Sequence, residues 1–328
     1  MLFARYRGLV LGSTIYSAPR SAWALLIVAL FAVSSAGAVL QSMTEVPPIL
    51  RASWRMQGTA LILLPGFIYQ IYHTDSKIFE LRDIIIIFVS SIFLAAHFGS
   101  WVWSLDHTSL VHSLLFVTSH PLVVVILMPI IGSKVRKGHV LGASIGFLGA
   151  ALTLKDIDSG GEVTLIGNLF AFIGAVTVVG YLFSGRYLRS ERKMPLFIYA
   201  FPVTFLSAVW LTPTSIILEG TTISQVVPET SLFGWFDISW ILWVGYLSLG
   251  PGLLGHTGIN AVLRWFSPLI VSIALLFEPV IGGFIGYIWN GEISLGFWTI
   301  LGGVLMLTGA IIVKLEEANE QTIDESPS

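Results

Sequence analysis

Two titratable side chains stand inside long apolar stretches of this sequence, and each immediately precedes a proline. Glu278 precedes Pro279 in ALLFEPVIGGFIGY, and His120 precedes Pro121 in FVTSHPLVVV. A carboxyl or imidazole group in such surroundings can take up and release a proton. A proline removes a backbone donor, so the carbonyl four residues earlier in a helix loses its partner. Each site therefore combines a proton-carrying group with a weakened helical turn.

Further polar side chains in apolar stretches are expected to face the same interior. His97 and Trp101 are four residues apart, as are His256 and Asn260, so each pair shares one helical face. Tyr181 belongs to a stripe of small and polar residues on another stretch. Lipid would not tolerate these polar faces, so we expect them to point into the molecule.

Two arginines lie near the start of the apolar stretch at 47–72. Arg55 is about two turns into that stretch, where it either binds an anionic group or extends to the near interface. Arg51 is closer to the end, and we expect its side chain to extend to the interface. Glu278 is the candidate proton-coupling residue, and the candidate substrate-binding residues are Arg55, His97, Trp101, His120, Tyr181, His256, Asn260 and Glu278.

These residues also have structural alternatives. Glu278 could pair with Arg55 and only join two helices, and the histidines could form hydrogen bonds between helices. A metal site is disfavoured because the histidines lack a tight spacing such as H-x-x-x-H and no thiolate accompanies them. No metal and no cofactor are predicted.

The pentapeptide GASIG at 142–146 fits the G-x-S-x-G pattern of serine hydrolases. That motif needs a strand-to-helix turn, which is not expected here. Gly142, Gly146 and Gly149 instead form the kind of small-residue face that lets two helices pack closely. Ser144 lies about 200° round the helix from Gly142 and points away from that face. The chain is therefore not predicted to be an enzyme, and no catalytic residue is assigned.

The composition indicates an integral membrane protein. Hydrophobic residues make up 55% of the chain and charged residues 11%, with a mean hydropathy of +0.85, whereas soluble domains carry about 25% charged residues. The net charge of −2 leaves no basic surface for nucleic acid, and the absence of cysteine excludes disulfides. The expected partners are a small-molecule substrate and the lipid bilayer, with no nucleic acid. A second copy of the chain, giving a homodimer, is also a candidate partner.

Apolar runs long enough to span a bilayer, about 20 residues each, predict ten helices. They lie at 21–43, 47–72, 83–105, 109–132, 138–155, 164–185, 195–218, 238–263, 267–289 and 294–314. The fold class is therefore an all-α integral membrane protein. Residues 1–20 are an N-terminal segment, and residues 315–328 are expected to form a disordered acidic tail.

Loop charges predict the orientation. Lysine and arginine gather in the loops on one side of the predicted helices, and Lys155 stands apart on the other side. The positive side faces the cytosol, so both termini and the acidic tail are expected to be cytosolic. The plasma membrane or a bacterial inner membrane is the expected location, with an endomembrane as the alternative.

The chain repeats itself. LAAHFGS at 94–100 matches LLGHTGI at 253–259, so His97 corresponds to His256. VTSHPLV at 117–123 lies over LLFEPVI at 275–281, which pairs His120 with Glu278. The matches occur in order, and they divide the chain into a first half, 21–155, and a second half, 164–314, of five helices each. Because five is odd, the second half enters the membrane from the opposite side, an arrangement typical of transporters.

The closing segment resembles EamA-like members of the drug/metabolite transporter superfamily. The resemblance rests on Glu278-Pro279, the glycine-rich run that follows, Gly291-Glu292, and a last helix of the form G-x-x-L-x-x-x-G. VPPILRASWR at 46–55 resembles the start of the second helix of that family, with its arginine at Arg55.

This resemblance implies ten helices in two inverted five-helix EamA-like repeats around a central cavity, with the fifth and tenth helices at the periphery. Family members move amino acids, drugs, sugar conjugates and other polar metabolites. The Lys-Arg pair that sugar-phosphate members carry in the ninth helix is absent from SPLIVSIALLFEP. A phosphorylated substrate is therefore disfavoured.

We predict a secondary transporter or exporter of small organic metabolites, amino-acid-like or amphipathic, that works by alternating access with proton coupling at Glu278. The first alternative is an uncoupled exchanger, for example of the sugar-conjugate or nucleoside type, in which Glu278 is structural. The second is a membrane-embedded enzyme or scaffold.

Overall fold

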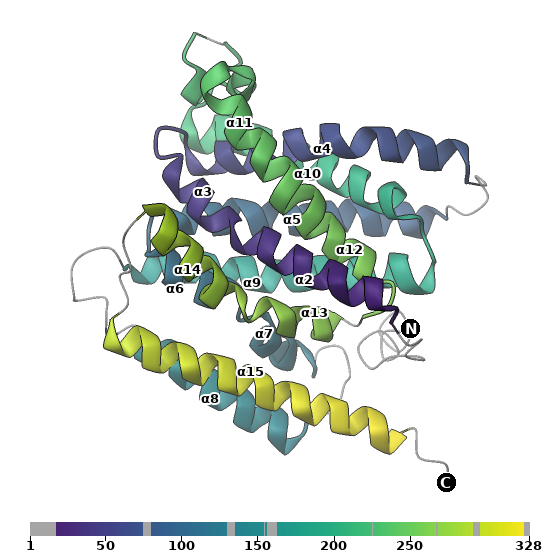
Figure 1. The fold of residues 1–328 in the computed structure, drawn as a ribbon, viewed down its shortest axis with the longest axis vertical. Coiled ribbons are helices and arrows are strands. Elements are labelled where there is room, and N and C mark those ends of the chain that lie inside the picture. The colour runs from purple at the N-terminus through teal and green to yellow at the C-terminus, as the bar shows by residue number, and fades with distance from the viewer. Residues whose placement is uncertain are drawn as a thin grey trace.

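Helices provide almost all the regular structure of the chain (Figure 1). The computed structural model describes residues 18–74, 80–129, 135–153, 155, 163–224, 226–266, 268–290 and 296–324. Within these ranges, extended structure is limited to one isolated bridge between Thr222 and Ser231. Helices suit apolar runs in lipid because they satisfy every backbone hydrogen bond within the segment.

The helices follow the apolar runs predicted from the sequence. In the first half they are α2 (Arg20–Ser34), α3 (Ala36–Ser42), α4 (Pro48–Tyr72), α5 (Leu81–Leu105), α6 (Leu110–Val117), α7 (His120–Leu127) and α8 (Lys137–Thr153). In the second half they are α9 (Leu165–Arg186), η4 (Tyr187–Glu191), α10 (Leu196–Glu219), η5 (Pro228–Thr230), η6 (Gly234–Phe236), α11 (Ile238–Leu247), η7 (Ser248–Thr257), α12 (Gly258–Val262), α13 (Pro268–Leu275), α14 (Glu278–Asn290) and α15 (Phe297–Asp324).

Six helical segments of the described residues are long and apolar enough to cross a membrane. They are Arg20–Ser42, Leu81–Leu105, Leu110–Leu127, Leu165–Glu191, Leu196–Glu219 and Ile238–Val262. The chain is therefore an all-helical, multi-pass integral membrane protein. The start of α2 and the end of α15 lie on the same side of the molecule, the right in Figure 1, and the prediction that this side is cytosolic remains a prediction.

At both prolines the structure has a break between two helices, where the sequence predicted a weakened turn within one helix. α6 ends at Val117 and α7 begins at His120, while α13 ends at Leu275 and α14 begins at Glu278. A proline has no N–H group and its ring clashes with the carbonyl four residues earlier, so it is tolerated in the first turn of a helix and not in its interior, which explains a new helix beginning here. A third irregularity was not predicted: η7 is a ten-residue π-helical segment that contains Pro251 and carries His256. Such wide turns are often found at functional sites.

The glycine face of GASIG packs two helices together. α8 lies alongside α15 at the lower edge of Figure 1. A Cβ atom on Gly142 would collide with the backbone of Gly309 and Val313, so only glycine permits this approach. Ser144 is exposed on the opposite face. The predicted packing role of the glycines is confirmed.

The prediction of a disordered tail from residue 315 is wrong for most of its length. α15 continues to Asp324, so residues 315–324 are helical. The sequence LEEANEQ is rich in good helix formers, and a helix already packed along α8 supplies the nucleus for their extension. Residues 325–328, and residues 1–17 of the predicted N-terminal segment, lie outside the described part of the chain.

Candidate functional site

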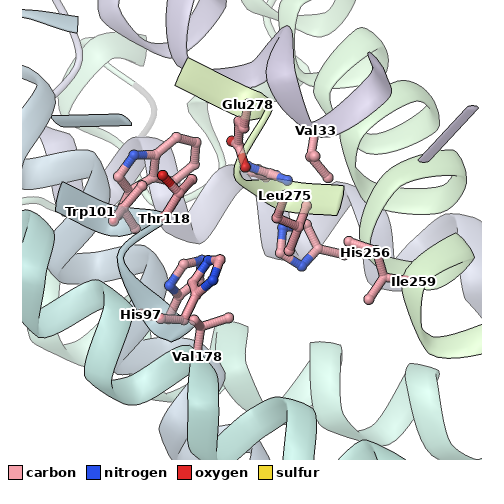
Figure 2. Close-up of a pocket in the computed structure, with 12 residues that line it drawn as sticks. Val33, His97, Trp101, Thr118, Val178, His256, Ile259, Leu275 and Glu278 are labelled. Carbon is pink, nitrogen blue, oxygen red and sulfur yellow. The ribbon is translucent and has the colours of Figure 1, made fainter. Parts of the chain in front are cut away.

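A small, largely buried cavity lies between residues of the first and second halves of the chain (Figure 2). Its volume is about 30 Å³, which is room for about two water molecules. The first half contributes Val33, Arg55, His97, Trp101, Val117, Thr118 and His120, and the second half contributes Val178, His256, Ile259, Leu275 and Glu278. The cavity must widen before it can hold an organic solute.

Six of the residues predicted from the sequence share this cavity. The repeat mates His97 and His256 face one another, with ring centroids 6.0 Å apart. The other mates, His120 and Glu278, are the first residues of α7 and α14, so both helix interruptions open onto the cavity. In Figure 2, Glu278 points toward the space between His97 and His256. Helical spacing and the repeat together account for this convergence.

Tyr181 and Asn260 stand behind the wall rather than in it. The Asn260 side-chain amide donates a hydrogen bond to the Tyr181 hydroxyl at 2.6 Å, and both side chains are buried. The Tyr181 ring centroid is 6.3 Å from that of His256. The two residues support His256 and do not line the cavity.

Arg55 supplies the guanidinium group of the cavity wall. Its side chain has 0% exposed surface, and its guanidinium lies 4.3 Å from the centre of the Phe98 ring. Nε, Nη1 and Nη2 have no hydrogen-bond partner among the described residues. Of the two predictions for Arg55, extension to the interface is therefore wrong. Buried polar groups are nearly always bonded, so an unpartnered guanidinium calls for a ligand or water.

Other polar atoms around the cavity also lack partners in the described structure. They are Nε1 of Trp101, Nδ1 of His120, Nδ1 of His256 and Oδ1 of Asn260. His97 differs, because its Nδ1 donates to the Gly174 carbonyl at 2.9 Å and fixes the ring. In the neutral form of His97, Nε2 is therefore an acceptor.

Glu278 is the acidic residue of the cavity wall and is 8% exposed. Arg55 attracts its carboxylate across the cavity. No ion pair or hydrogen bond joins the two side chains, although both lie in the described structure. The two charges therefore balance one another at a distance while both remain open to a solute.

Arg51 lies elsewhere, and the expectation that it extends to the interface is wrong. Its side chain is 0% exposed and forms an ion pair with Asp106, just beyond the end of α5. It also donates to the Leu40 carbonyl in α3. The ion pair joins residues 55 positions apart, a relation that helical spacing could not reveal.

Sequence reasoning missed part of the wall. Thr118 lies at the first helix interruption and was not predicted. Val117 and Leu275 also line the wall, and they are the residues four positions before Pro121 and Pro279 whose carbonyls were expected to lose their partners. Val33, Val178 and Ile259 are apolar residues on apolar helices, and no sequence signal separates them from core residues. Phe98, the aromatic partner of Arg55, was also missed because it adjoins His97 and not Arg55 in sequence.

Comparison with known proteins agrees with this architecture. The model of the EamA-like transporter family matches residues 20–155. A search of curated protein sequences finds no match. A solved structure titled "Crystal structure of protein" superposes with a TM-score of 0.61 and 19% identity, over 94% of this chain and 100% of that chain. At that identity the likeness shows the fold alone. Residues 20–155 are therefore an EamA-like transporter domain of the drug/metabolite transporter superfamily.

Proposed function

We propose that this protein is a secondary active transporter or exporter of small organic metabolites, amino-acid-like or amphipathic, that works by alternating access. One observation carries the proposal: both halves of the chain place charged and aromatic side chains around one buried cavity. Substrate sites of inverted-repeat transporters lie at the repeat interface, often at interrupted helices. Here both interrupted helix pairs, α6–α7 and α13–α14, reach the cavity.

Ten spans in two inverted five-helix repeats are part of this proposal. The packing supports it, because α4 lies against its repeat mate α10 and α8 against its mate α15. The same twofold relation pairs α2 with α9 and α5 with η7–α12. It therefore relates two further contacts, the one between α2 and η7–α12 and the one between α9 and α5. The end of the family match at residue 155 supports the boundary between the repeats.

Alternating access requires the cavity to open to one side at a time. The short helices α7 and α14 begin at the cavity, so rotation about the residues that precede them would move His120 and Glu278. Few backbone hydrogen bonds need to break at a turn that a proline has already interrupted. The 30 Å³ cavity corresponds in this scheme to a closed intermediate.

Glu278 is the proposed proton-coupling residue. An ionised carboxylate at the centre of a bilayer costs at least about 2.5–3.5 kcal/mol on the insertion scale. The nearby guanidinium of Arg55 offsets part of that cost, and a proton removes it. The charge state of Glu278 should therefore change as the cavity opens to water and closes again.

Counterflow in proteoliposomes tests the proposal. A thermal-shift screen on the purified protein first supplies a solute, and its uptake is then measured with and without an inward proton gradient. We expect the gradient to drive accumulation by the natural protein, and Glu278→Gln to lose that accumulation while remaining folded. Ser144→Ala, on the exposed face of α8, is the control and should not alter transport. Gradient-driven accumulation by Glu278→Gln would refute the role of Glu278.

An uncoupled exchanger is the second candidate. It is favoured by the position of Arg55, whose charge already balances Glu278 when the cavity holds no solute. In this case Glu278 is structural, and counterflow proceeds at the same rate whether or not a proton gradient is present.

A further inference from the structure

Among the unpartnered atoms of the cavity wall in the described structure, those whose role is fixed are donors, on Arg55 and Trp101. Arg55 carries five N–H groups, and none of its three nitrogens has a partner in the described structure. Nε1 of Trp101 is a further donor without a partner. Glu278 is the acid among the residues that line the cavity. A solute that satisfies this wall must bring acceptor atoms, and preferably a negative charge.

The setting of Arg55 favours a carboxylate. The Phe98 ring covers one face of the guanidinium at 4.3 Å, which holds its plane and leaves its N–H edges for bonding. Guanidinium edges match the two oxygens of a carboxylate. One turn earlier on α4, Arg51 bonds to the carboxylate of Asp106. Arg55 has the same chemistry and burial but no such acid bonded to it.

Charge balance then fixes the state of Glu278. With Arg55 and Glu278 both ionised, the empty cavity is neutral overall. An enclosed monoanion would leave one uncompensated negative charge in a low-dielectric space, which is expensive. A proton on Glu278 restores neutrality, and it also removes repulsion between the two carboxylates.

We propose that the site encloses a small organic carboxylate, bound edge-on by the Arg55 guanidinium, together with one proton held on Glu278. This inference rests on the proposed transport function and narrows its substrate class to organic anions.

Other titratable groups near Glu278 must be considered as holders of the proton. α4 presents Arg55, α5 His97, α7 His120, η7 His256 and α9 Tyr181. Of the helices packed directly on α14, α3 has no titratable residue, and α2 has Arg20 at its far end. α6 has His112, which is engaged with Thr299 and Asn168. A proton on a histidine would place a second cation beside Arg55, so Glu278 is favoured.

Binding to the purified full-length protein tests the solute class. Thermal unfolding is measured with phenylacetate, phenylacetamide, phenethylamine and phenylalanine, which share a ring and differ in charge. A smaller set of acetate, acetamide and glycine covers solutes close to the closed cavity in size. We expect stabilisation by the two carboxylate anions and not by the amides or the amine.

Variants test the two assigned roles. Arg55→Gln should weaken binding of the carboxylate on the order of 100-fold, because a buried charge-assisted bond is lost. Arg82→Gln is the matched control, since Arg82 also stacks on an aromatic ring, 4.9 Å from the centre of Tyr187, but lies outside the cavity wall. Calorimetry in two buffers of different ionisation enthalpy should show one proton taken up per anion. Glu278→Gln should still bind the anion and take up none.

Three results of the binding measurements overturn the proposal, and a fourth follows them. They are preferential binding of the amine or the zwitterion, anion binding that Arg55→Gln leaves intact, and proton uptake that persists in Glu278→Gln. Failure of every carboxylate to bind also refutes it. Counterflow of whatever solute does bind is measured separately, so a wrong solute class is distinguishable from a protein that transports nothing.

Discussion

Two arginines one turn apart on α4 are equally buried, but one is hydrogen-bonded and the other is not. Arg51 and Arg55 are both 0% exposed. Arg51 is bonded to Asp106 and to the Leu40 carbonyl, so it joins α4 to α5 and α3. Arg55 has an aromatic ring on one face and no hydrogen-bond partner in the described structure. The comparison teaches that a bonded buried charge holds helices together, whereas an unbonded one keeps its bonding capacity for a ligand.

The largest expected effect comes from removing each arginine in turn. Arg51→Met leaves Asp106 without its cation, and we expect the free energy of unfolding to fall by about 3 kcal/mol, the low end for a buried pair because Asp106 is 27% exposed. Arg55→Met should cost less than about 1 kcal/mol, because it removes a desolvated charge that made no hydrogen bond and a proton can neutralise Glu278 in its absence, while transport is lost. Denaturant unfolding in detergent measures both. Equal destabilisation by the two variants would contradict the comparison.

The contact between α8 and α15 lies away from the cavity, and like Arg51 it is expected to stabilise the fold without taking part in solute binding. Gly142→Leu forces a side chain against the backbone of Gly309 and Val313, and we expect a loss of about 2 kcal/mol. Ser144→Leu, exposed on the same helix, is the control and should have little effect. Transport per folded molecule should not change in either variant. A fall in transport without a fall in stability would place the contact between α8 and α15 in the transport cycle.

Tyr181 is neither a residue that only joins helices nor one that lines the cavity wall. Tyr181→Phe removes the hydroxyl that accepts from Asn260, and we expect a loss of about 1 kcal/mol in stability. Its effect on solute affinity should be small, because Tyr181 does not line the closed cavity. Tyr246→Phe is a matched control, since that hydroxyl donates to Ser35 at 2.7 Å but its side chain is 47% exposed. A large loss of solute affinity in Tyr181→Phe would show that the widened cavity reaches Tyr181.

The smallest expected effect is at Arg192, which follows η4. Its guanidinium bonds to Asp83 and to Glu80, and the bond with Asp83 raises the pKa of Arg192 above its usual range. Glu80→Gln should cost at most about 0.5 kcal/mol, because the Glu80 side chain is 62% exposed and its ion pair is screened. Asp83→Asn should cost more, because Asp83 is 1% exposed. Thermal unfolding at low and high salt compares the two variants. An equal cost for both would show that burial does not set the strength of these pairs.

The parts of the site that follow from helical geometry and the repeat could be predicted. His120 and Glu278 precede prolines at matched positions, and the structure places both helix interruptions beside them. His97 and Trp101 share a helical face, so the prediction that His97 points into the molecule applied to Trp101 as well. The helical structure of residues 315–324 was not predicted. An acidic composition predicts that a segment is solvated, but it does not reveal that the segment continues a helix already packed along α8.

By itself the sequence determined that the chain is helical and enters a membrane, since long apolar runs leave no other way to satisfy the backbone. It also indicated which polar residues are exceptional there, and that Pro121 and Pro279 weaken their helices. That Arg51 is bonded and Arg55 is not became visible in the packing of the helices. The reason is physical: whether a buried charge has a partner depends on which helices meet around it, and that is set by packing between distant segments.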